Sequence, residues 1–125
     1  MHWLVIGAGG ALGAMARHGL NHVIHQRQIA GTFPTGILLI NVLGSVAIGA
    51  IAGLLASNRI AMSSPMRMFV IVGFLGGFTT FSSFSLDTLA LVRGGHLSQA
   101  ILNVVGQVVL SLVGVWIGFR AAGGG

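Results

Sequence analysis

Residues 68–92 read MFVIVGFLGGFTTFSSFSLDTLALV, a stretch long and apolar enough to cross a membrane as one helix. Its only charged residue, Asp87, lies near its far end. Its middle, however, holds a Gly-Gly pair followed by five hydroxyl side chains between residues 79 and 85. The stretch therefore predicts a membrane span with a polar centre.

Three further stretches have spanning length, at residues 3–23, 35–56 and 98–119, and short polar links separate them. We therefore expect a single transmembrane domain, residues 1–125, that is built from four helices. The first stretch follows no basic segment and is interrupted by glycines. We expect it to remain as a span rather than to be cleaved as a signal peptide.

The composition indicates that lipid is the solvent. Of 125 residues, 54% are apolar and 6% are charged, and the mean hydropathy is +0.96. A soluble domain of this size would need far more polar surface. The arginines give a net charge of +5 but form no basic run, so no nucleic-acid partner is expected. Cysteine is absent, which excludes disulfides and thiolate metal sites.

The arginines specify the orientation in the membrane poorly. Four spans would put both termini on one side, and the two sides carry nearly equal numbers of arginines: Arg59, Arg67 and Arg120 against Arg27 and Arg93. Two interpretations stay open. Either Arg17 or a partner decides the orientation, or the protein inserts both ways and pairs head to tail.

Small residues recur four apart in every span, which places them on one helical face. They are Gly9 with Gly13, Ser45 with Gly49 and Gly53, Gly73 with Gly77, and Gly114 with Gly118. Small residues let membrane helices approach closely. Because four spans bury little area in one monomer, we expect at least one of these faces to contact another subunit.

The Gly-Gly pair at residues 76 and 77 and the two threonines after it disfavour a continuous helix. A break would free backbone groups that lipid cannot satisfy, so it would have to face protein, water or an ion. The alternative is an unbroken helix whose hydroxyls bond to the preceding turn. The clustering of hydroxyls around the glycines favours the break.

Phe78, Phe81 and Phe84 are spaced three apart along the same stretch. Such a stripe is usually core or a lipid contact. A ring edge also carries partial positive charge, however, and can face an anion without a full countercharge. The alternation of these rings with hydroxyls leaves both interpretations open.

Asn41 is the strongest isolated polar residue of the second stretch, and Asn103, Gln107 and Ser111 form a polar stripe in the fourth. At membrane depth these side chains need hydrogen-bond partners. They form either contacts between helices or the lining of a path.

The charged residues offer little catalytic chemistry. Arg17 can reach the membrane interface or attract anions at a vestibule. Asp87 is the sole carboxylate, so no acid–base pair can form within one chain and no enzyme is expected. His18 and His22 lie four apart, but no carboxylate completes a metal site beside them.

Together these residues resemble the Fluc-type fluoride channel family, also called CrcB. The resemblance covers nearly the whole chain and rests on Gly13-Ala14 before Arg17, Asn41 with Gly44, and GGFTTFSSFS at residues 76–85. It implies an all-α integral membrane protein with a broken third helix, packed as an antiparallel, dual-topology homodimer. It also implies passive, fluoride-selective export from the cytoplasm across the bacterial inner membrane, which lowers fluoride toxicity.

The resemblance further implies a set of site residues. Backbone carbonyls of Gly76 and Thr79 would hold a structural sodium ion at the dimer centre, and Arg17 would lie in a vestibule. The residues implied for the fluoride pore are Asn41, Phe81, Ser82, Ser83, Phe84, Asn103, Gln107 and Ser111. Asn103 and Gln107 stand where the family more often has tyrosine and serine, which leaves the coordination in the outer pore open.

Two other functions compete with the channel. A small multidrug transporter of dual topology shares the length and the spans, but it needs a carboxylate in its first span, and this chain has none there. A non-transporting membrane assembly protein would use the glycines for packing. That function has no use for the cluster of hydroxyls and phenylalanines.

Overall fold

The computed structural model describes residues 2–27 and 33–125, and these residues form helices and connecting segments only. The elements are α1 (His2–Arg27), α2 (Thr35–Ala56), α3 (Ser64–Arg67), η1 (Met68–Leu75), α4 (Gly76–Phe78), α5 (Phe81–Arg93) and α6 (Leu97–Ala121). The element η1 is a π-helix. Residues 64–93 therefore run as one long rod that changes its helical geometry and is interrupted once.

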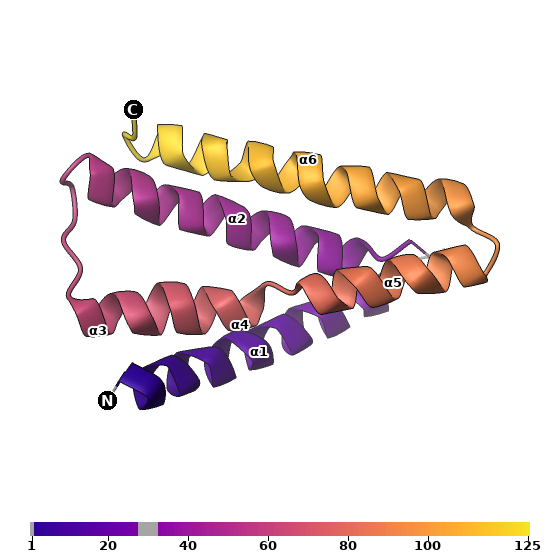
Figure 1. Ribbon diagram of the computed structural model, residues 1–125, viewed down its shortest axis with the longest axis horizontal. Coiled ribbons are helices and arrows are strands. Elements are labelled where there is room, and N and C mark those ends of the chain that lie inside the picture. The colour runs from indigo at the N-terminus through magenta and orange to yellow at the C-terminus, as the bar shows by residue number, and fades with distance from the viewer. Residues whose placement is uncertain (1, 28–32) are drawn as a thin grey trace.

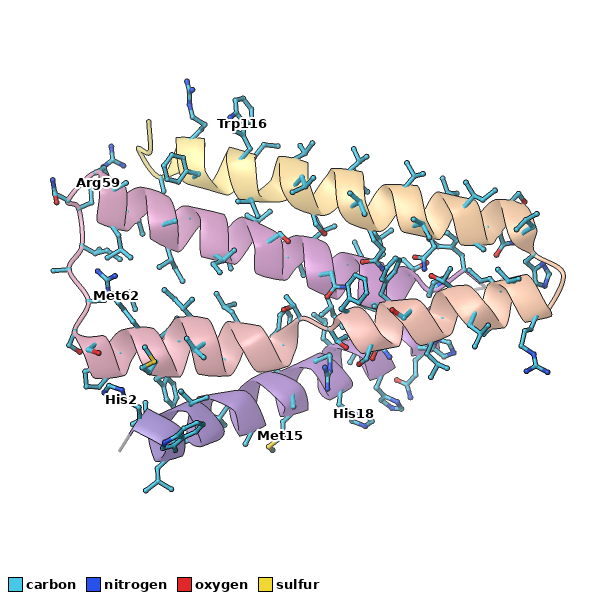
Figure 2. All side chains as sticks on the ribbon, in the orientation of Figure 1. His2, Met15, His18, Arg59, Met62 and Trp116 are labelled. Carbon is cyan, nitrogen blue, oxygen red and sulfur yellow. The ribbon has the colours of Figure 1, made fainter. Side chains whose placement is uncertain are left out.

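The helices pack as a bundle in which α2 lies beside α6, and α1 lies beside η1 and α4 (Figure 1). The two ends of the chain lie at the same end of the bundle as the link between α2 and α3 (Figure 1). Arg59 and Trp116 also lie at this end (Figure 2). The arrangement agrees with the prediction of an even number of passes.

Among the described helices, three are long and apolar enough to cross a membrane: α2, the rod of residues 64–93, and α6. The first predicted span, residues 3–23, is a helix of 26 residues but does not belong to this group. Arg17, several histidines and many glycines lower its mean hydropathy. The prediction of four apolar spans is thus confirmed for three of the four long helical passes among the described residues.

The glycines that recur four apart, called the glycine stripes below, let helices of the same chain pack closely against one another. A Cβ atom at Gly49 would overlap the carbonyl of Val115 in α6, and one at Gly13 would overlap the carbonyl of Phe74 in η1. Gly118 in turn faces the backbone of α2. At these glycines a neighbouring helix of the same chain occupies the space, and the contact of such a face with another subunit stays a prediction.

Candidate functional site

The rod of residues 64–93 breaks at Thr79 and Thr80. Thr79 has φ −87° and ψ 153°, and Thr80 has φ −150° and ψ 121°, so both residues are extended. The predicted break in the third span is confirmed. It follows the Gly-Gly pair, however, because Gly76 and Gly77 still belong to the short helix α4.

Asn41 holds the broken backbone in place from the neighbouring helix α2. The Thr80 amide donates to Asn41 Oδ1 at 2.9 Å, and Asn41 Nδ2 donates to the Thr80 carbonyl at 3.2 Å. One side chain thus replaces the helical partners of both polar backbone groups of Thr80. In a membrane such replacement is required, because lipid offers no hydrogen bonds.

Hydroxyl groups close the two helix ends at the break. Thr79 Oγ1 donates to the Leu75 carbonyl at 2.9 Å, in addition to the bond that this carbonyl accepts from the Thr79 amide at 3.0 Å. Thr80 Oγ1 accepts from the Ser83 amide at 3.1 Å and caps the N-terminus of α5. The same oxygen contacts the hydroxyls of Ser82 at 3.2 Å and Ser83 at 3.3 Å.

The break lies close against α2 because residue 44 is glycine. A Cβ atom at Gly44 would overlap Cγ2 of Thr79. Rotating the Thr79 side chain would relieve the overlap only by moving its hydroxyl away from the Leu75 carbonyl. Gly44 is therefore a packing residue of the break.

We expect Gly44→Ala to lower the free energy of unfolding by about 1–3 kcal/mol, because the added methyl group overpacks this contact. The double variant Gly44→Ala with Thr79→Ser should regain most of the loss, since serine lacks Cγ2 but keeps the hydroxyl. Thermal unfolding of the purified proteins in detergent measures both effects. A double variant no more stable than Gly44→Ala alone would contradict the proposed contact.

A chain of side-chain amides extends from Asn41 into α6. Asn41 Nδ2 donates to Gln107 Oε1 at 3.0 Å, and Gln107 Nε2 donates to Asn103 Oδ1 at 3.4 Å. Asn103 Nδ2 then donates to Thr88 Oγ1 at 3.0 Å. Asn103 is fully buried and Gln107 is 5% exposed. Every buried side-chain nitrogen or oxygen among the described residues has a hydrogen-bond partner.

A groove of about 490 Å³ lies beside the break. Its polar lining consists of Asn41, Ser45, Thr79, Thr80, Gln107 and Ser111, together with Gly44 and Gly76. Its apolar lining includes Ile48, Ile71, Leu75, Phe81, Phe84, Val108 and Leu112. Among the described residues, no charged residue lines the groove, so its polarity there comes from amides, hydroxyls and backbone groups.

Two of the three regularly spaced phenylalanines reach this groove. Phe81 and Phe84 meet edge to face, with ring centroids 5.2 Å apart and an interplanar angle of 68°. Phe84 is 8% exposed, whereas Phe81 is 77% exposed. Phe78 instead stacks on Phe74 and packs against the core. The predicted stripe therefore divides between the groove and the helix packing.

The structure brings only part of the predicted site to the groove. Ser82 and Ser83 hydrogen-bond to Thr80 but do not line it, and Asn103 is buried behind Gln107. Arg17 is half-buried on α1 and does not line it either. His18, also on α1, points away from the rest of the bundle (Figure 2). Among the described residues, no cluster of three or more His, Cys, Asp or Glu side chains could hold a metal ion.

The sequence reasoning missed two residues of this network, Thr80 and Thr88. Thr80 carried a readable signal, because a threonine directly before a hydroxyl-rich helix start is a typical N-cap. Thr88 carried none, because its partner Asn103 lies on another helix. Only the packing of α5 against α6 brings the two side chains together.

Comparison with known proteins shows similarity along the whole chain. The family described as "CrcB-like protein, Camphor Resistance (CrcB)" matches residues 4–119. A protein of Nitrobacter hamburgensis named "Fluoride-specific ion channel FluC 2" is 48% identical over 118 residues, which is 94% of each chain.

Proteins of two further organisms are similar to this chain, and each is named "Fluoride-specific ion channel FluC". The protein of Opitutus terrae is 50% identical over 123 residues, covering 98% of this chain and 92% of the relative. A protein of Thermus thermophilus is 42% identical over 121 residues, covering 97% of this chain and 94% of the relative.

Proposed function

The chain belongs to the CrcB family, and from this premise we propose that it is a fluoride-selective ion channel and not an enzyme. It lets fluoride leave the cytoplasm passively and so lowers fluoride toxicity. The observation that carries the proposal is the uncharged groove, rich in hydrogen-bond donors, beside a helix break.

The groove suits fluoride for a physical reason. Fluoride is small and strongly hydrated, so a selective path must replace its water with many donors. A fixed cation would bind the ion too tightly for rapid release. The amide of Asn41 and the hydroxyl of Ser111 supply neutral donors instead, and Gln107 positions the Asn41 amide by accepting from it.

The phenylalanine pair adds a second kind of contact. A ring edge is partially positive, and Phe81 and Phe84 already meet edge to face. Fluoride would pass along these edges. Ser82 and Ser83, bonded to Thr80 next to the groove, would continue the hydroxyl track, and buried Asn103 would support the outer pore through Gln107.

Asn41 would donate to fluoride by exchanging one acceptor for another. Its Nδ2 group donates to the Thr80 carbonyl and to Gln107 Oε1. The Thr80 carbonyl belongs to the backbone, whereas the Gln107 side chain can rotate. A passing anion would therefore compete with Gln107 Oε1 for the Asn41 donor.

The chemistry around the break also supports a structural sodium ion held by carbonyls of Gly76 and Thr79. In an unbroken helix these carbonyls would accept from the amides of Thr80 and Ser83. Those two amides instead bond to Asn41 Oδ1 and Thr80 Oγ1. Carbonyl oxygens are ligands that a hard cation accepts. Sodium would supply positive charge that fixes the carbonyls at the break.

A second copy of the chain would complete both sites. Two carbonyls are too few ligands for sodium, and Phe81 is 77% exposed although it lines the groove. The nearly equal numbers of arginines at the two ends are compatible with insertion in both orientations. We therefore propose an antiparallel, dual-topology homodimer in the bacterial inner membrane. Arg17 would attract anions at its vestibule.

Fluoride efflux from liposomes tests the function. Purified protein is reconstituted into vesicles loaded with potassium fluoride, and valinomycin is added so that potassium can balance the charge. We expect rapid fluoride release on a fluoride electrode and little chloride release from matched vesicles loaded with potassium chloride. Fluoride retention equal to that of protein-free vesicles would refute the proposal.

A further inference from the structure

The hydrogen bonds beside the groove form one directed chain that begins at Thr80, the N-cap of α5, and ends within α5. The Thr80 amide donates to Asn41, Asn41 to Gln107, and Gln107 to Asn103. Asn103 donates to Thr88, whose hydroxyl donates to the Phe84 carbonyl at 2.8 Å. All these bonds point the same way, so their dipoles reinforce one another.

Thr88 fixes the direction of this chain at its far end. A threonine hydroxyl has a single proton, and Thr88 gives it to the Phe84 carbonyl. The Thr88 oxygen can then only accept a hydrogen bond from the neighbouring Asn103 side chain. Asn103 must therefore turn its Nδ2 group toward Thr88 and its Oδ1 toward Gln107.

The constraint passes from Asn103 to the groove. Gln107 must present Nε2 to the Asn103 oxygen, so its Oε1 faces Asn41 and accepts from Nδ2. At the near end, the Thr80 amide can only donate, which keeps Asn41 Oδ1 turned toward the break. Thr88 at one end of the chain and the Thr80 amide at the other therefore impose the same orientation on Asn41. In this orientation the Asn41 Nδ2 group faces Gln107 and the groove.

We propose that Thr88, which does not line the groove, is a positioning residue that orients the donor of Asn41 for fluoride by holding Gln107 Oε1 toward it. The proposal rests on the proposed function. Without the Thr88 hydroxyl, Asn103 can offer either its oxygen or its amide group to Gln107. If Gln107 turns over, its amide group meets the amide group of Asn41, so the hydrogen bond that holds the Asn41 donor in position is lost.

The test compares two variants that each remove one atom group of Thr88. Thr88→Val keeps the shape but removes the acceptor, whereas Thr88→Ser keeps the hydroxyl and removes the methyl group. We expect Thr88→Val to slow fluoride efflux by about tenfold, because a buried amide loses its partner. Thr88→Ser should stay within about twofold of the parent. Equal impairment of both variants, or unimpaired flux in Thr88→Val, would overturn the proposal.

A spectroscopic measurement separates positioning from packing and needs no flux. The side-chain NH₂ resonances of Asn41 and Gln107 are followed by nitrogen-15 NMR in the detergent-solubilised protein, with Asn41→Leu and Gln107→Leu to assign them. Thr88→Val should shift both resonances, and Thr88→Ser should leave them near the parent positions. Thr88→Ala serves in place of Thr88→Val if the latter does not fold.

The two measurements fail in different ways. If the parent passes no fluoride, the proposed function is wrong, while the resonances still report whether Thr88 orients the amides. If the parent passes fluoride but the Asn41 resonances stay in place in Thr88→Val, the positioning role is wrong and the channel function stands.

Discussion

Replacement of Asn41 by leucine is expected to lower fluoride flux by about a hundredfold or more, which corresponds to about 2.7 kcal/mol. Leucine has nearly the same shape but neither donates nor accepts. The Thr80 amide would lose its acceptor, and Gln107 Oε1 would lose its donor. A buried polar group without its partner costs about 1–3 kcal/mol. The anion would also lose the donor that the groove offers beside the break.

The measurement is the initial rate of fluoride efflux from liposomes, normalised to the amount of inserted protein. Ser85→Ala is the control, because Ser85 lies on α5 near the break but donates its hydroxyl to Phe81 of its own helix and is exposed. The control should conduct like the parent. Flux in Asn41→Leu within about threefold of the parent would remove Asn41 from the path, since a single neutral hydrogen bond can account for a change of that size.

The membrane helices were predictable from composition and hydropathy because lipid imposes a simple rule on length and polarity. The span expected at residues 35–56 coincides with α2, and that expected at 98–119 lies within α6. The first pass was predicted on the same grounds, but its helix lacks the apolar composition of the other three. Its glycines allow close packing on η1. In a hydropathy average, the same glycines only lower the value.

The break was predictable in kind but not in position. Local propensity identifies Gly76 and Gly77 as the weak point of the helix. The structure keeps both residues helical and breaks after them. The deciding interaction is with Asn41, which lies 39 residues away from Thr80 in the sequence and takes over its amide and carbonyl. The sequence around the break does not predict that contact.

The candidate site was predictable where residue type alone restricts the choices. Asn41 and Gln107 are amides in apolar helices and had to find partners, and they found each other. The role of Thr88 depended on the rotation of α5 against α6. A change of one residue in the helical phase would have faced the Thr88 hydroxyl elsewhere.

For the glycine stripes, too, the sequence predicted the kind of contact but not its partner. Their spacing predicts close helix contacts, and the contacts exist. Spacing does not say which helix is the partner, and here the partners lie within the chain: η1 for Gly13 and α6 for Gly49. The open groove with exposed Phe81 is a surface that the second copy in the proposed dimer could cover.

Gly118→Ala is expected to lower the free energy of unfolding by about 3 kcal/mol. A Cβ atom there would overlap the Val46 carbonyl and come within 2.9 Å of the Ala50 amide nitrogen. Both are backbone atoms of α2, so no side chain can rotate to make room, and α2 and α6 must move apart. Moving them apart would also strain the hydrogen bond between Asn41 and Gln107, which joins the same two helices.

Gly106→Ala is the matched control, because it makes the same change in the same helix where space exists. A Cβ atom at Gly106 would meet only Leu38 Cδ1, at 4.0 Å, which is an ordinary contact. We expect this variant to be as stable as the parent or slightly more stable, since alanine favours a helix over glycine. Thermal unfolding in detergent distinguishes the two. If Gly118→Ala and Gly106→Ala unfold at the same temperature, close contact of α2 with α6 at Gly118 does not stabilise the bundle.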